Sequence, residues 1–313
     1  MDEPRVTGLV VRVDKKRCHV ELDDGSVRLL APRGKLFDKR GTTKNPIAVG
    51  DRVAVTIESD GIGSIDTVLP RRTKLARSSA GEGTREQVLV ANVDLVVVVS
   101  SIDNPTFRPT IVDRILAGAE RGGMDACIVI NKIDLEDEAS DGRESDCWLE
   151  LYRKLGYEAI GTCAADGRGV ERLRELMRAR ICVVSGLSGV GKSSLLNAIE
   201  PGLSLRVGSV SERGAREGRH TTTHSSLIRL QNGAHVVDTP GIRNFGLFDI
   251  DPTEVAELFR EFQPFLGACN FDDCSHEHEP RCAILDAVRE GAIPASRHAS
   301  YLELLRDARG GRL

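Results

Sequence analysis

The chain lacks long apolar segments and has few aromatic side chains. Aromatic residues make up 4% of its 313 residues, and Phe37 is the only one among the first eighty. The apolar run from Val93 to Ser100 is too short to cross a bilayer, and no secretory signal precedes the cysteines. These absences argue against a membrane protein and against extensive stacking on nucleic-acid bases. We therefore expect a cytoplasmic protein.

A glycine-rich loop is the clearest motif that is present. Residues 186–193 read G-L-S-G-V-G-K-S and match the phosphate-binding pattern GxxxxGK[ST], between an apolar strand at 181–184 and a helix at 194–199. Lys192 is expected to reach the β- and γ-phosphates of a nucleotide, and Ser193 to hold Mg²⁺. A turn without any ligand is the alternative. The residues of this loop expected to bind nucleotide are Gly186, Ser188, Gly189, Val190, Gly191, Lys192, Ser193 and Ser194.

A second motif, N-K-I-D at 131–134, follows the apolar β-branched run 126–130. Ligands bind at the carboxyl ends of the strands in an open α/β sheet. Asp134 is expected to accept hydrogen bonds from the ring N–H and the exocyclic amine of guanine. Lys132 would then lie along the base, and Asn131 would tie this loop to the phosphate loop. The alternative is a solvated turn that caps the next helix.

Two further segments suit the same nucleotide. D-T-P-G at 238–241 follows another apolar strand, and we expect Asp238 to hold Mg²⁺ through water and Gly241 N–H to contact the γ-phosphate. A plain β-turn is the alternative for this segment. The remaining base-side loop, which usually contains a lysine that is missing here, is expected at Thr162, Cys163 and Ala164.

The usual catalytic glutamine is also missing. Ile242 follows D-T-P-G, where many GTPases have a glutamine that orients the attacking water, so we expect slow intrinsic hydrolysis. The basic segment 211–224 has the composition of a loop that γ-phosphate and Mg²⁺ order. Thr222 is the expected second Mg²⁺ hydroxyl. Arg219 and His220 could neutralise transition-state charge, position water or touch RNA phosphate. These three residues are the catalytic candidates, and a basic surface loop is the alternative.

The order of the two main motifs is the reverse of that in an ordinary P-loop GTPase, where the phosphate loop opens the domain. Here N-K-I-D precedes it by about fifty residues. This order predicts a circularly permuted GTPase domain with a mostly parallel sheet. The supporting pattern comprises strands at 93–100, 126–130 and 157–162, and helices near 110–121, 144–155 and 170–178. We expect a linker at 76–88 and an acidic insert at 136–146.

The first eighty residues differ in kind from the rest. Short alternating runs at 8–13, 18–22 and 52–57 predict a small β-barrel of the OB type. This region has 16 Lys and Arg against 11 Asp and Glu, in a chain of net charge −4. A basic barrel is expected to contact RNA through the backbone rather than by stacking. A solubilising charge pattern on a packing domain is the alternative.

The carboxyl-terminal region contains a metal-binding pattern. Three thiols and one imidazole suit a closed, structural Zn²⁺ site, with His278 as a rival ligand and ordinary core cysteines as the alternative. The expected ligands are Cys269, Cys274, His276 and Cys282.

Helices are expected in the same region at 252–262 with Asp251 as N-cap, at 283–290 and at 296–307. Basic side chains here are expected either to contact RNA phosphates or to be solvated: Arg281, Arg289, Arg297, His298, Arg306 and Arg309.

Together these motifs resemble the small-ribosomal-subunit-dependent GTPase A family, bacterial circularly permuted GTPases of ribosome assembly. The resemblance covers nearly the whole chain and rests on five segments, namely 131–134, 186–194, 218–222, 238–241 and the Cys/His spacing. It implies an OB-fold domain at 1–80, a permuted GTPase domain at 87–247 and a helical zinc-binding domain at 248–313. It also implies the small ribosomal subunit and its rRNA as partners, and hydrolysis that the subunit stimulates.

We therefore expect a monomeric, Mg²⁺-dependent GTPase that hydrolyses GTP to GDP and phosphate and assists late maturation of the small subunit. Ordering of 213–224 by GTP would control binding and release. Two other function classes stay open. One is a GTP-sensing RNA-binding module whose hydrolysis is incidental. The other is a nucleotide-modifying or metal-dependent enzyme using the Cys/His cluster, against which the closed four-ligand set argues.

Overall fold

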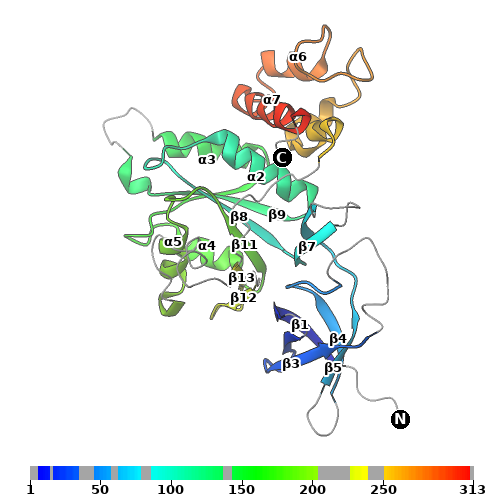
Figure 1. The fold of residues 1–313 in the computed structure, drawn as a ribbon. Helices are drawn as coiled ribbons and strands as arrows, with labels where there is room; N and C mark the ends of the chain where they lie inside the picture. The colour runs from blue at the N-terminus through cyan, green and yellow to red at the C-terminus, as the bar shows by residue number, and fades with distance from the viewer. Residues whose placement is uncertain are drawn as a thin grey trace.

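The computed structural model describes residues 6–14, 17–34, 46–57, 63–78, 86–136, 143–203, 226–238 and 250–310. The predicted catalytic segment 211–224 and residues 239–242 lie outside these ranges. A β-barrel, a central α/β sheet and a helical unit follow one another along the chain (Figure 1). Within the described ranges, no helix combines the length and apolar character needed to cross a membrane.

The N-terminal barrel has five strands, and its closure confirms the predicted small β-barrel. They are β1 (Val6–Val13), β2 (Cys18–Leu22), β3 (Val27–Pro32), β4 (Arg52–Ile57) and β5 (Gly63–Val68). Their order is β1-β2-β3-β5-β4, and β4 also pairs with β1, so the sheet closes on itself. Alternate side chains fill the interior, where Val10, Val20, Val53 and Ile65 are fully buried.

The expected linker at 76–88 is wrong in part, because strands form at both of its ends. β6 (Lys74–Ser78) and β7 (Glu86–Ala91) pair antiparallel. Leu75 and Val90 lie opposite each other and belong to the core of the central sheet, while Val88 packs with Ala48. Burying these apolar side chains against a core is more favourable in free energy than leaving them exposed to water in a linker.

The central sheet shows the predicted permutation in its strand order. Its strands are β8 (Leu95–Ser101), β9 (Asp125–Asn131), β10 (Glu158–Gly161), β11 (Ile181–Ser185), β12 (Ser226–Arg229) and β13 (His235–Asp238). The order is β10-β9-β8-β11-β13-β12, and all neighbours are parallel except β12 and β13. Strands that precede β11 in the chain lie on one side of it, and strands that follow lie on the other.

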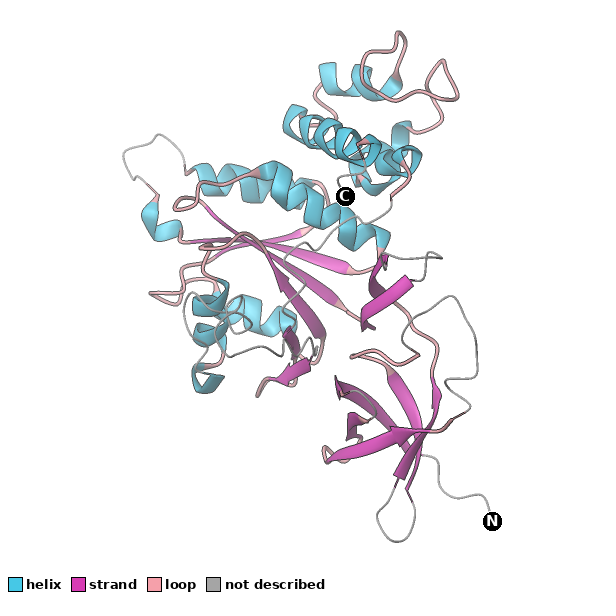
Figure 2. Ribbon diagram, viewed as in Figure 1, coloured by secondary structure: helices cyan, strands magenta, loops and turns pink. Residues whose placement is uncertain are grey.

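Helices cover both faces of this sheet (Figures 1 and 2). The elements are α2 (Pro109–Arg121), α3 (Glu144–Lys154), α4 (Val170–Met177) and α5 (Lys192–Ile199), with short turns η1 (Ile133–Leu135) and η2 (Pro201–Leu203). Val96 and Val98 of β8 pack with α2 and α3, whereas Val97 and Val99 pack with α4 and α5. A continuous apolar strand is therefore buried on both faces, as the sequence predicts.

The barrel is joined to the central sheet at one edge. Arg12 of β1 pairs with Ser226 of β12, so the two sheets are continuous there. Oε2 of Glu21 in β2 accepts a hydrogen bond from Nε2 of His235 at 2.9 Å, and the same carboxylate pairs with Arg229. The barrel thus lies against the strand that ends at Asp238.

The C-terminal unit corrects one expected helix. In place of a helix at 252–262, two 3₁₀ helices form, η4 (Pro252–Leu258) and η5 (Arg260–Phe265), followed by α6 (Ala283–Arg289) and α7 (Ala295–Arg309). Phe259 between them is extended. This break lets Phe259 and Phe262 both enter the core, with ring centroids 5.2 Å apart. Asp251 caps η4 as predicted, accepting from Thr253 N–H at 2.9 Å.

Candidate nucleotide site and metal centre

The glycine-rich loop turns sharply between β11 and α5. Gly186, Gly189 and Gly191 have φ of 145°, 86° and 92°, which glycine adopts more readily than any other residue. A Cβ on Gly186 would lie 1.9 Å from the carbonyl oxygen of Val99. Nζ of Lys192 donates to the carbonyls of Gly186 at 2.8 Å and of Leu187 at 2.6 Å. The loop therefore curls around the ammonium at the N-terminus of α5, the geometry of a phosphate cradle.

Asn131 joins the two nucleotide motifs. Its side chain is 1% exposed, and its Nδ2 donates to the carbonyl of Val190 at 2.9 Å. Its Oδ1 accepts from Oγ1 of Thr162 at 3.0 Å. Both contacts form because β9, β10 and β11 are parallel and end at one edge of the sheet. The predicted tie between the N-K-I-D loop and the phosphate loop is thus present.

The expected base-side loop lies beside N-K-I-D. The carbonyl of Thr162 accepts from Ile133 N–H at 3.3 Å. Burial raises the pKa of the Cys163 thiol, and a hydrogen bond to Asp134 raises it further, so the protonated thiol stays a donor to that carboxylate. Ala164 follows directly and is half-buried. The three segments predicted to surround the nucleotide therefore meet at this edge.

Several predicted site residues lie outside the described ranges, namely Arg219, His220, Thr222 and Gly241. Asp238 ends β13, which is parallel to β11, so its backbone reaches the same edge as the phosphate loop. Ser193 and Ser194 stand in the first turn of α5, where Ser193 is 7% exposed. Ser188 is exposed on the loop itself.

A further loop at this edge contains no recognised motif. Ser101 ends β8, and Asn104 and Pro105 follow it. The carbonyl of Asn104 accepts a hydrogen bond from Nζ of Lys132. The only sequence signal is the turn-forming run D-N-P at 103–105, shortly after a buried strand. That signal predicts a turn but does not indicate which motif the turn contacts.

The four predicted metal ligands converge in the C-terminal unit. One ligand atom from each of Cys269, Cys274, His276 and Cys282 lies within 4.8 Å of the others. Sγ of Cys269 is 3.8 Å from Sγ of Cys282, and Nδ1 of His276 is 3.3 Å from the latter. Tetrahedral ligands of one Zn²⁺ stand roughly 3.8 Å apart for two sulfurs and roughly 3.5 Å for sulfur and nitrogen. The donor set and its spacing thus fit one metal ion, and His278 is not among the four.

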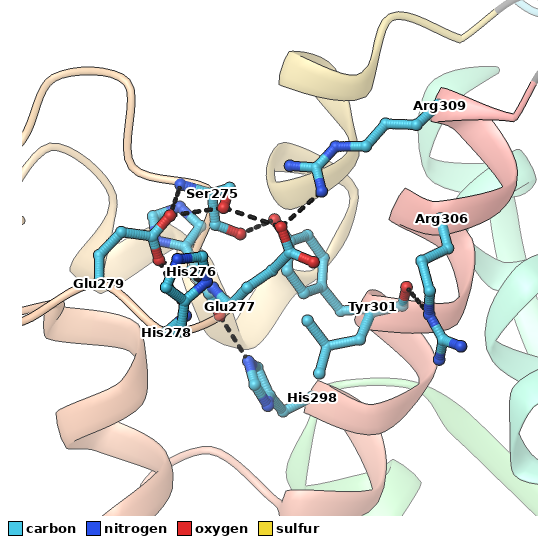
Figure 3. Close-up of polar contacts among 10 residues, drawn as sticks. Ser275, His276, Glu277, His278, Glu279, His298, Tyr301, Arg306 and Arg309 are labelled. Carbon is cyan, nitrogen blue, oxygen red and sulfur yellow. Dashed lines mark hydrogen bonds and ion pairs between the residues drawn. The ribbon is translucent and has the colours of Figure 1, made fainter.

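α7 supports the loop that carries His276 (Figure 3). Nε2 of His298 donates to the carbonyl of His276 at 2.8 Å, and the hydroxyl of Tyr301 donates to the carbonyl of Ser275 at 2.7 Å. Arg309 pairs with Glu277 at 2.5 Å. The metal loop is therefore fixed to α7 by two of its backbone carbonyls and by the ion pair between Glu277 and Arg309.

The basic residues of this unit correct an expectation for Arg297. Arg297 is neither solvated nor available to RNA, because it is 1% exposed and paired with Asp113 and Glu261. Its neighbour His298 donates a hydrogen bond to the backbone of the metal loop. Arg289 and Arg306 stay on the surface. Helical position alone did not distinguish an inward-facing arginine from the others.

A reversed order of nucleotide motifs on a parallel sheet, with a barrel before it and a Cys₃His cluster after it, defines a circularly permuted GTPase. The family model described as RsgA GTPase matches residues 68–248. Among solved structures, YjeQ from Thermotoga maritima has a TM-score of 0.78 at 35% identity, covering 98% of this chain and 99% of its own. YloQ, described as a circularly permuted GTPase, has a TM-score of 0.77 at 28% identity, covering 98% of this chain and 96% of its own.

Similarity to curated proteins extends over the same length. The small ribosomal subunit biogenesis GTPase RsgA of Chlorobaculum tepidum is 41% identical over 309 residues, covering 96% of this chain and 97% of that protein. The protein of the same name from Thermotoga maritima is 40% identical over 308 residues, covering 98% of each. The chain therefore belongs to the RsgA GTPase family.

Proposed function

We propose that this GTPase binds the small ribosomal subunit and assists its late maturation, with hydrolysis of GTP to GDP and phosphate stimulated by the subunit. One observation supports the proposal above all others, namely the hydrogen bond from Asn131 to the carbonyl of Val190. It unites a guanine-type motif and a phosphate loop that come in reversed order in the chain. Relatives of the same length have the name small ribosomal subunit biogenesis GTPase.

The nucleotide lies, in this proposal, across the edge where β9, β10 and β11 end. Asp134 accepts from guanine, Lys132 lies along the base, and Lys192 faces the phosphates, with the loops at 162–164 and 186–194 completing the site. Mg²⁺ neutralises phosphate charge when it is bound, with Ser193, Thr222 and Asp238 as the residues that would hold it. The fit is supported by Ser193 in the first turn of α5.

Slow intrinsic turnover follows from Ile242, which cannot hydrogen-bond a water where a glutamine usually does so. Arg219, His220 and Thr222 are the proposed catalytic residues, completed by the subunit. Ordering of their loop by GTP would create the binding surface, and hydrolysis would release it. The protein acts as a cytoplasmic monomer.

The flanking regions have proposed roles as well. We assign 1–80 to an RNA-contacting OB-fold domain, 87–247 to the GTPase domain and 248–313 to a domain folded around one structural Zn²⁺. Closed Cys₃His coordination leaves no position for substrate, which supports a structural ion. Contacts from the barrel would be to RNA phosphates.

The test is GTP turnover of the full chain with and without purified small subunits. We expect strong stimulation by small subunits and none by large subunits. A Lys192→Ala protein should lose the stimulated rate, because the phosphates lose the ammonium group that faces them. Equal rates with and without small subunits would refute the proposal.

A further inference from the structure

The loop between β8 and α2 contacts both nucleotide motifs, although it belongs to neither. The carbonyl of Asn104 accepts a hydrogen bond from Nζ of Lys132. On the other side, Cδ of Pro105 lies 3.5 Å from the point where Gly189 would carry a Cβ. This loop therefore lies where the base motif and the phosphate loop come together.

The loop is held in one shape by its own hydrogen bonds. Ser101 is fully buried, and its Oγ donates to the carbonyl of Pro105 at 2.7 Å. Asp103 accepts from Asn104 N–H at 2.7 Å, and Phe107 N–H donates to the carbonyl of Ile102 at 3.2 Å. These hydrogen bonds therefore fix the orientation of the Asn104 carbonyl.

Lys132 is held at both of its ends. Its backbone is left-handed, with φ of 60° and ψ of 36°. Its Cε lies 4.0 Å from the point where Gly191 would carry a Cβ, and its ammonium ends at Asn104. The aliphatic part of the side chain therefore runs beside the phosphate loop. A free lysine loses rotamer freedom when its side chain is fixed, and this contact fixes the side chain before any nucleotide arrives.

We propose that Asn104 is a positioning residue for guanine nucleotides. Its carbonyl anchors the ammonium of Lys132, so that the side chain is already extended along the surface that the base will cover. The inference rests on the nucleotide site proposed above. The residue type at position 104 matters because it determines how readily the backbone holds a positive φ, which is 50° at Asn104. Asn and Gly adopt this left-handed conformation most readily among the residues.

Two substitutions at Asn104 therefore have different expected effects on nucleotide affinity. In Asn104→Ala the loop relaxes out of the left-handed conformation in the free protein, and it must return to it when nucleotide binds. We expect GTP and GDP affinity to fall about 5- to 30-fold, the factor that corresponds to the cost of holding alanine in the left-handed conformation. Asn104→Gly retains the conformation and should bind within about twofold of the wild type.

The experiment measures binding of fluorescent GDP and GTP to the full chain for both Asn104 variants, for Lys132→Met and for the Asn104→Ala/Lys132→Met double variant. The loss caused by Asn104→Ala should disappear in the Lys132→Met background, because the anchored group is gone. KM should rise with little change in kcat. A loss that persists in that background, or wild-type affinity of Asn104→Ala, would overturn the inference.

Lys192→Ala separates this inference from the site on which it rests. If Lys192→Ala and Lys132→Met weaken binding while Asn104→Ala does not, the site stands and the role of Asn104 is wrong. If Lys192→Ala binds nucleotide like the wild type, the proposed site itself is wrong. Ser101→Ala tests the same loop from its buried end, and it should weaken binding in the same direction. Melting curves of every variant verify that each protein is folded.

Discussion

Arg297 of α7 and Asp113 of α2 form a buried ion pair, with Nη1 and Oδ1 2.5 Å apart and each side chain 1% exposed. Glu261 supplies a second carboxylate to the same guanidinium at 2.5 Å. Burial would lower the pKa of Arg297, but Asp113 and Glu261 together raise it, so it stays charged. The pair joins the metal-binding unit to the helix that covers the central sheet.

Removing one carboxylate from this pair should destabilise the protein strongly. We expect Asp113→Ala to lower the free energy of unfolding by about 3 kcal/mol, the lower end for a broken buried pair, because Glu261 still faces the guanidinium. Urea denaturation measures the loss. The matched control is Asp307→Ala, whose pair with Arg114 joins the same two helices but leaves these side chains 22% and 29% exposed. It should cost about 1 kcal/mol or less, and equal losses would contradict the prediction.

The metal ligands can be assigned by two histidine variants. His276 has its Nδ1 among the three sulfurs, whereas His278 is exposed outside the four-ligand cluster. His276→Ala should therefore purify with less than one zinc per chain, and His278→Ala with one, as measured by elemental analysis. Cys147→Ser, which removes an exposed thiol far along the chain from the cluster, should also retain the metal. Zinc retained in His276→Ala and lost in His278→Ala would reverse the assignment.

The sequence predicted those parts of the site that depend on strand ends. Asn131 and Val190 could be expected to meet because each follows a parallel strand, and such strands end at one edge. Asn104 could not be assigned a partner, since a turn signal carries no information about what lies across the edge. Arg297 could not be recognised as buried, because its partners Asp113 and Glu261 come from other helices. Long-range pairs of this kind follow from packing, which sequence periodicity does not specify.

Two glycines with similar positive φ should differ in how their replacement by alanine affects nucleotide binding. Gly191 and Gly233 have φ of 92° and 82°. A Cβ on Gly191 would lie 2.4 Å from Nδ2 of Asn131, whereas the nearest atom at Gly233 is 3.8 Å away. We expect Gly191→Ala to break the bridge to Val190 and to weaken GTP binding at least tenfold, a loss comparable to one buried hydrogen bond. Gly233→Ala should reduce stability alone, and a similar loss of affinity in both variants would contradict this reasoning.

Base selectivity should depend on Asp134. A carboxylate accepts both donors that guanine presents on this edge, whereas an amide offers one acceptor and one donor, which suits xanthine. Asp134→Asn should therefore bind GTP roughly 5- to 150-fold more weakly, the range for one bidentate contact to a base, and bind XTP more tightly than the wild type does. Competition titrations with the two nucleotides measure both changes.

Asp166→Asn is the matched control, because Asp166 lies in the same group of loops but is exposed and paired with Arg168 at 2.8 Å. Its hydrogen bonds to Arg168 hold the pKa of Asp166 below its usual value, so at neutral pH the substitution removes one negative charge, as Asp134→Asn does. A general loss of negative charge at this edge would change GTP binding equally in both variants. A change of preference from GTP to XTP in Asp134→Asn alone means that this carboxylate contacts the base directly. No gain in XTP affinity in that variant would mean that guanine is recognised elsewhere.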